Sequence, residues 1–197
     1  MRSLVACLAL CCALAIIAPH ADAQIAEVFG GYSYVYAHTP VTTTIACGGV
    51  PINTCPTETT TYRTNLNGFE LAGTFKPGTW FGITGDYSSH YGTSAGASNH
   101  LQTFLVGPKF SYPADISPFV HVLVGGANNS LGSGSTVNAI VVPTSHTCFA
   151  VAAGGGIDAR IAPFVSLRVI QFDYLLTTFH STTQNQPRIS TGIVIHF

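Results

Sequence analysis

Few side chains in this sequence have the chemistry of a catalyst. A serine nucleophile needs a histidine within hydrogen-bond distance and a third group that orients the base. His180 and Ser181 are adjacent, and Glu58 is the one acid in the long connecting segments. Adjacent residues of an extended strand face opposite sides, so His180 and Ser181 are poorly placed as partners. We therefore predict no catalytic residues.

The sequence also contains no clear metal-binding motif. Zinc sites bring cysteines and histidines together at short spacings such as CxxC or HExxH, and neither spacing occurs here. Five histidines lie near the ends of the segments described below, at positions too scattered for a ligand set: His38, His90, His100, His146 and His180. We predict no metal site and no cofactor.

The charged residues follow a regular pattern along the chain. In eight segments, large aliphatic and aromatic side chains alternate with Gly, Ser, Thr and charged side chains. Val120, Val122 and Val124, for example, are separated by His121 and Leu123. A period of two is typical of β-strands with two different faces. Five acids and four bases share the less apolar face: Glu27, Glu70, Asp86, Lys109, Asp158, Arg160, Arg168, Asp173 and Arg188.

The segments that must position these charges are about ten residues long and are separated by turn residues. Arg168 and Asp173 share a face only if a β-bulge near Ile170 adds a residue between them. The connections alternate between long and short, as in an up-and-down barrel. The predicted strands are 27–37, 67–75, 80–91, 101–112, 118–127, 148–161, 164–179 and 188–197.

Composition favours lipid rather than water around the apolar face. The chain has 197 residues, of which 47% are hydrophobic and only 8% charged, with a net charge of −1. A soluble surface needs about a quarter or more charged residues, and a nucleic-acid-binding protein needs a basic patch. Strands cross a bilayer only in a closed sheet. We therefore predict an all-β, eight-stranded antiparallel transmembrane barrel that binds no nucleic acid.

The first residues have the pattern of an export signal. Arg2 precedes an apolar run, and Ala21 and Ala23 form an A-x-A cleavage pattern, which predicts a signal peptide at 1–23 and a barrel domain at 24–197. Three cysteines follow the predicted cleavage point, in an oxidising compartment. Cys47 and Cys55 bracket a short loop and are a possible disulfide, while Cys148 is expected to be a buried thiol.

Several short motifs resemble one protein family. They are VFGGYSY at 28–34, VGPKF at 106–110, GGGID at 154–158 and IVIHF at 193–197. With the signal peptide and the alternation, they resemble small outer-membrane barrels of the OmpA transmembrane-domain or opacity-protein type. The resemblance implies an outer-membrane location and a last strand read by the barrel-assembly machinery, with Ile193, Ile195 and Phe197 as the assembly signal. It carries no peptidoglycan anchoring, because no soluble peptidoglycan-binding domain is expected.

An eight-stranded barrel is just wide enough for its inward side chains to fill it. Unpaired ions in that space are costly, so we expect ion pairs that link Glu70, Asp86, Lys109, Arg168 and Asp173. The predicted function is a structural or surface-interaction role with a lumen closed by paired charges. A narrow ion channel is the alternative, and an outer-leaflet lipid-modifying enzyme is the third hypothesis. Expected partners are outer-membrane lipid or lipopolysaccharide, the assembly machinery and an unknown external ligand.

Overall fold

The computed structural model describes residues 25–45, 56–94, 97–132, 134–136, 139–141, 144–179 and 182–197. The predicted signal peptide at 1–23 and the proposed Cys47–Cys55 bridge lie outside these residues. Among them, no helix has the length and hydropathy needed to cross a bilayer. The strands are β1 (Ala26–Ile45), β2 (Thr57–Phe75), β3 (Phe81–Ser94), β4 (Ala97–Ser111), β5 (Ile116–Leu131), β6 (Gly134–Thr136), β7 (Ala139–Val141), β8 (Thr144–Ala162), β9 (Val165–Phe179) and β10 (Thr182–His196).

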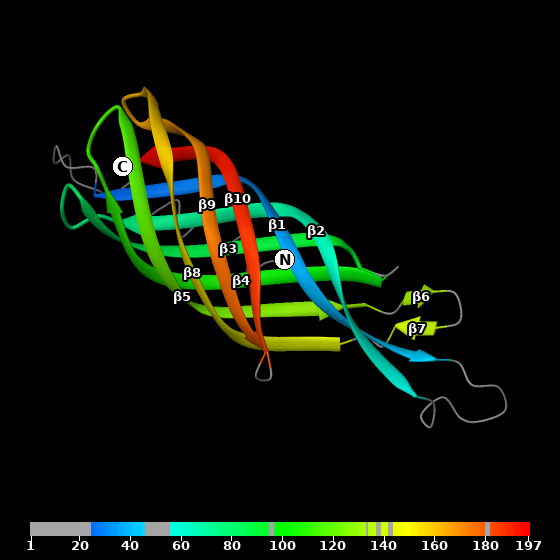
Figure 1. The fold of residues 1–197 in the computed structure, drawn as a ribbon. Helices are drawn as coiled ribbons and strands as arrows, with labels where there is room; N and C mark the ends of the chain where they lie inside the picture. The colour runs from blue at the N-terminus through cyan, green and yellow to red at the C-terminus, as the bar shows by residue number, and fades with distance from the viewer. Residues whose placement is uncertain are drawn as a thin grey trace, which may run out of the picture.

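Eight long strands form a closed antiparallel barrel, as the sequence predicts (Figure 1). Each strand pairs with the next long strand along the chain, and β10 pairs back onto β1. At this closure the Phe197 N–H donates to the Ala26 carbonyl oxygen at 2.9 Å. The barrel thus leaves no open strand edge between β1 and β10, which is the condition for strands to lie in hydrocarbon.

The two ends of the barrel differ in their connections. Three short turns join β2 to β3, β4 to β5 and β8 to β9, and both ends of the barrel chain lie beside them. We call this the short-turn end. At the opposite, long-loop end, β1 and β2 project together beyond their neighbours, and the β6–β7 hairpin pairs with β1 at Thr43–Ile45 (Figure 1).

The strands are longer at this end than the sequence analysis predicts. The sequence analysis predicts loops for part of this end, but these residues are strand: 38–45, 57–66, 128–131, 144–147 and 182–187. On β2, side chains from Thr57 to Arg63 are exposed on both faces. With water on both sides, apolar and polar residues no longer alternate, so the period-two signal disappears although the backbone pairing continues.

The bulge predicted near Ile170 is confirmed. Ile157 of β8 pairs with Ile170, and the next β8 residue, Asp158, pairs with Arg168. One residue of β9, Val169, is therefore left without a partner on β8, and both Val169 and Ile170 face outward, 51% and 47% exposed. The extra residue keeps the side chains on either side of it in phase.

The outside of the barrel is apolar. On β5, Val120, Val122 and Val124 are 44–60% exposed, whereas His121 and Leu123 between them are 5% or less exposed. Aromatic side chains extend this surface to the short-turn end, where Trp80 stacks on Phe110 with ring centroids 5.8 Å apart. Polar residues inside and apolar residues outside are the arrangement of a membrane barrel.

Candidate functional site: the charged lumen

The centre of the lumen is organised by Arg188, which comes from β10 and is completely buried. Its Nη1 lies 2.9 Å from Asp86 Oδ1 of β3, and its Nη2 lies 2.7 Å from Asp173 Oδ2 of β9. Its Nε is 3.6 Å from Glu70 Oε2 of β2. One guanidinium thus faces three carboxylates from three strands, and we call these four residues the Arg188 cluster.

Neutral groups and a histidine supply the remaining hydrogen bonds of these carboxylates. Ser190 donates to Glu70 Oε2 at 2.5 Å, and His121 Nε2 lies 2.7 Å from Asp173 Oδ1. Gln171 Nε2 donates to Glu70 Oε1 at 2.8 Å and to Asp173 Oδ2 at 2.7 Å. Buried charges are tolerated when each has such partners, because the attraction and the hydrogen bonds offset desolvation.

A second group of ions lies nearer the short-turn end. Lys109 of β4 is 2.9 Å from Glu27 Oε2 and 3.9 Å from Asp158 Oδ2, and Glu27 also pairs with Lys76. Arg168 binds Asp158 with two hydrogen bonds, of 2.8 Å from Nε and 3.0 Å from Nη2. We call Glu27, Lys76, Lys109, Asp158 and Arg168 the Lys109 cluster.

Arg168 is also held between two aromatic rings. The centre of its guanidinium lies 4.2 Å from the ring centroid of Phe29 and 4.3 Å from that of Phe119. Both phenylalanines face inward and are 3% or less exposed. Cation–π contacts are strongest where water is excluded. The two rings therefore hold the Arg168 guanidinium in place between Asp158 and the Arg188 cluster.

Gln171 joins the two clusters. Its Oε1 accepts a hydrogen bond of 2.6 Å from Arg168 Nη1, while its Nε2 serves Glu70 and Asp173 of the Arg188 cluster. The sequence hypothesis linked Glu70, Asp86, Lys109, Arg168 and Asp173 directly. The structure brings Glu70, Asp86 and Asp173 around Arg188 instead, and it places Lys109 and Arg168 on Glu27 and Asp158.

Arg160 departs from the expected interior network. It lies at the short-turn mouth, is exposed, and makes no ion pair among the described residues. The sequence analysis also missed three polar members of the lumen: Gln171, His121 and Ser190. Their inward phase was readable from the alternation, but neutral residues carried no signal that marked them as links between ions.

Toward the long-loop end the lumen contains an apolar layer beside buried polar side chains such as His90, Thr177 and Gln186, and the sequence analysis did not predict this layer. Beyond Arg188, inward aliphatic side chains from six strands meet across the barrel with no more than 2% exposure. This apolar layer comprises Val35, Ala37, Leu66, Leu101, Leu105, Leu123, Ala127, Ala150, Ala152 and Leu175.

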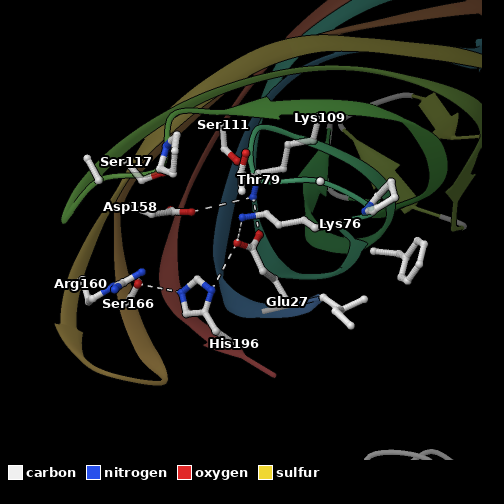
Figure 2. A pocket seen from close by; sticks show the side chains of 16 residues that line it. Glu27, Lys76, Thr79, Lys109, Ser111, Ser117, Asp158, Arg160, Ser166 and His196 are labelled. Atoms are coloured by element: carbon white, nitrogen blue, oxygen red, sulfur yellow. Dashed lines mark hydrogen bonds and ion pairs between the residues drawn. The ribbon is translucent and has the colours of Figure 1, made fainter. Parts of the chain in front are cut away.

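Little space remains inside. Between the two ion clusters there is a cavity of about 10 Å³, which is at the lower limit for a single water molecule. A larger cavity of about 790 Å³ occupies the short-turn mouth and is lined by residues that include Glu27, Lys76, Ser166 and His196 (Figure 2). Among the described residues, the lumen is therefore filled between the two ion clusters and hollow at the short-turn mouth.

The described histidines near the ends of the predicted strands do not gather at one place. His90 is buried inside the barrel, with Nε2 2.9 Å from Ser33 Oγ, and His100 stacks on Tyr91 with centroids 4.2 Å apart. His38 Nδ1 lies 2.9 Å from the Asn185 carbonyl oxygen, and His180 lies outside the described residues. Within the described part of the chain, no three His, Cys, Asp or Glu side chains gather as a metal site.

This chain resembles known proteins in its three-dimensional structure. No protein-family description and no curated sequence matches the chain. Neisserial surface protein A is similar with a TM-score of 0.59 and 11% identity, over 86% of this chain and 97% of that one. Ail, the attachment invasion locus protein of Yersinia pestis, crystallised with the heparin analogue sucrose octasulfate, has a TM-score of 0.54 and 12% identity, over 87% and 99%.

The outer membrane protease OmpT of Escherichia coli is also similar, with a TM-score of 0.51, 10% identity, and coverage of 92% of this chain and 99% of that one. The chain has the fold of an outer-membrane β-barrel. This confirms the fold that the sequence resemblance implies. The apolar exterior needs hydrocarbon around it, and closed barrels of this type lie in the outer membrane with short turns periplasmic and long loops external.

Proposed function

We propose that this outer-membrane barrel is a non-conducting surface protein, which anchors an external projection for contact with a partner. The observation that carries the proposal is the double closure of the lumen. The two ion clusters cross the middle of the lumen, and the apolar layer that includes Val35 and Leu175 crosses it on the external side. An ion that crosses must displace both, and its desolvation in the apolar layer is very unfavourable.

The external projection supports the contact role. β1 and β2 stay paired from His38–Arg63 to Thr44–Thr57, beyond the point where β2 last pairs with β3 at Asn67–Tyr91. The β6–β7 hairpin adds two short strands to the free side of β1. These strands give the projection a defined shape, which a binding surface needs because ordering a loop on binding costs conformational entropy.

The chemistry of this surface favours an uncharged partner. Along the predicted long connections 38–66, 92–100, 128–147 and 180–187, Glu58 and Arg63 are the charged residues, and Thr, Ser and Asn are abundant. Ail is bound to a sulfated polyanion in its crystal structure, but a polyanion needs a basic surface that this sequence lacks. Hydroxyl and amide groups suit the hydroxyls of a neutral glycan, including the sugars of lipopolysaccharide.

Assembly would follow the pattern implied by the family resemblance. Ile193, Ile195 and Phe197 face outward from the last strand and are 41–48% exposed. We infer that the assembly machinery reads this strand after a signal peptide at 1–23 is removed, leaving a barrel domain at 24–197. The Cys47–Cys55 disulfide remains a prediction for the external loop.

Planar-bilayer recording of the purified mature barrel tests the closed lumen. The expected result is no steady conductance in the wild type. Steady single-channel steps that change in Lys109→Ala would instead support the channel alternative. Binding to arrays of neutral glycans tests the contact role: signals that persist at high salt and are lost when 39–62 is replaced by a short turn support it, and absence of binding contradicts it.

Lipid chemistry is tested separately, since an enzyme acting on the outer leaflet would change the acyl chains of lipid A. Mass spectra of lipid A from cells with and without the protein are expected to be identical. Altered acyl chains would revive the enzyme hypothesis.

A further inference from the structure

Four inward side chains form a row across neighbouring strands at the periplasmic mouth. They are Arg160 of β8, Ser166 of β9, His196 of β10 and Glu27 of β1. Arg160 pairs directly with Ser166, and His196 pairs directly with Glu27. All four line the cavity of about 790 Å³ (Figure 2), so they face a space that is large enough for a small ligand.

The contacts within the row have the geometry of a nucleophile, a base and an orienting acid. Ser166 Oγ lies 2.8 Å from His196 Nε2, and His196 Nδ1 lies 3.3 Å from Glu27 Oε1. The second contact has an ion-pair distance but not the alignment of a hydrogen bond. Such catalytic contacts often tighten only when substrate is bound.

We propose that Ser166, His196 and Glu27 form a nucleophilic site that hydrolyses carboxylic esters in the periplasmic mouth of the barrel. Ser166 is the candidate nucleophile and His196 the candidate general base. Glu27 is a positioning residue, which holds the imidazole so that Nε2 faces Ser166. In the chain, Glu27 is 139 positions from Ser166 and 169 positions from His196. Only the closure of the barrel between β10 and β1 brings the three residues together.

The reaction follows from the contacts. The Ser166 oxygen attacks the ester carbonyl carbon, and its proton passes to His196 Nε2. The alcohol leaves with that proton, and an acyl group remains on Ser166. Water then attacks the acyl group and gives a proton to His196, which returns it to the Ser166 oxygen as the carboxylic acid departs. No oxidant, reductant or metal is needed.

Arg160 is placed to stabilise the negative charge that forms on the carbonyl oxygen. Side chains of directly paired residues have Cβ atoms about 4.5–5.5 Å apart, and Figure 2 shows the Arg160 guanidinium beside Ser166. Its guanidinium makes no ion pair among the described residues, so its donors are available. Lys109, by contrast, is already bound to Glu27.

Labelling with a fluorophosphonate tests the nucleophile directly. In this reaction the Ser166 oxygen bonds to phosphorus and fluoride leaves, so the adduct stays on the peptide and is located by mass spectrometry. The purified mature barrel, refolded in lipid, is expected to carry one adduct, at Ser166. No adduct on the folded wild type, or adducts spread over exposed serines, would overturn the proposal without any variant.

Ester hydrolysis by the same preparation gives the second test, with 4-nitrophenyl acetate and butyrate as probes. Ser166→Ala is expected to fall to the rate of the buffer. The matched control is Ser117→Ala, which removes a hydroxyl from the same cavity that donates to the Tyr112 carbonyl oxygen and contacts no histidine among the described residues. Equal rates in the two variants would contradict the proposal.

The supporting residues have distinct signatures. Arg160→Gln is expected to lower kcat/KM by about 10²-fold, the effect of losing one oxyanion donor. Glu27→Gln is expected to lower kcat with KM unchanged, because it orients the base and contacts no substrate. Each variant is checked for folding by its mobility in an unboiled gel. A folded Glu27→Gln barrel with normal kcat would remove Glu27 from the site.

Discussion

Replacement of Arg188 by methionine is the sharpest test of the lumen. The methionine side chain retains much of the aliphatic length but removes the guanidinium that faces Glu70, Asp86 and Asp173. The structure gives this group four hydrogen bonds to Asp86 and Asp173, of 2.7–3.3 Å. All of them are buried, so water cannot replace the lost partners.

The expected cost follows from this environment. Removing one partner of a buried ion pair destabilises a protein by about 3–5 kcal/mol, because the other charge remains without compensation. His121 and Gln171 still serve Asp173, but Asp86 keeps no cation within ion-pair distance among the described residues. We therefore expect the free energy of unfolding to fall by about 4 kcal/mol, within that range.

Guanidinium unfolding of the barrel in lipid vesicles measures this change, with the fluorescence of Trp80, the single tryptophan, as the signal. The matched control is Arg63→Met, on the exposed external part of β2, where a surface substitution changes stability by about 0.5 kcal/mol or less. Adding Asp86→Asn to Arg188→Met should recover part of the loss. Equal unfolding midpoints for Arg188→Met and Arg63→Met would refute the central role of Arg188.

Three further variants test other parts of the barrel. In the same unfolding assay, Gly154→Ala should lower the free energy of unfolding by about 1–3 kcal/mol, because the added Cβ would overlap the Asp173 carboxylate. The control is Gly73→Ala, which should be neutral because no atom lies within 4 Å of the added Cβ. Equal values for the two variants would contradict this. Leu105→Ala should lower the free energy of unfolding by about 2–5 kcal/mol, since Leu105 is completely buried in the apolar layer. An unfolding midpoint equal to that of the wild type would show that the layer is loosely packed. Phe197→Ala should slow insertion into vesicles, followed by the shift between unboiled and boiled bands, and an unchanged rate would remove the terminal assembly signal.

The sequence predicted the barrel because its exterior obeys a simple rule. Val120, Val122 and Val124 must all face lipid, and this requirement alone fixes the phase of β5. The bulge near Ile170 was predictable for the same reason, since Arg168 and Asp173 cannot both face inward without an extra residue. Contact with hydrocarbon therefore requires apolar residues at every second position of each strand, and this alternation can be recognised in each strand by itself.

The interior carries no comparable signal, because its contacts join strands that are far apart in sequence. Arg188 and Asp86 meet across the lumen, at a depth set by barrel shear and side-chain length rather than by spacing along the chain. The inward leucines show the same limit: Leu105 and Leu123 occupy polar-phase positions, and only assembly of the ring shows that they meet. The row from Arg160 to Glu27 likewise exists only after β10 closes on β1.

The lumen is filled unevenly along its length, with a cavity at the short-turn end and packed side chains in the middle. The cavity of about 790 Å³ at the short-turn end reaches as far as the Lys109 cluster, and the apolar layer around Leu105 lies between it and the long-loop end. Reagents too polar to pass the bilayer will therefore modify Lys76 from one side only. Labelling of Lys76 from one side of the membrane therefore shows which way the barrel is oriented.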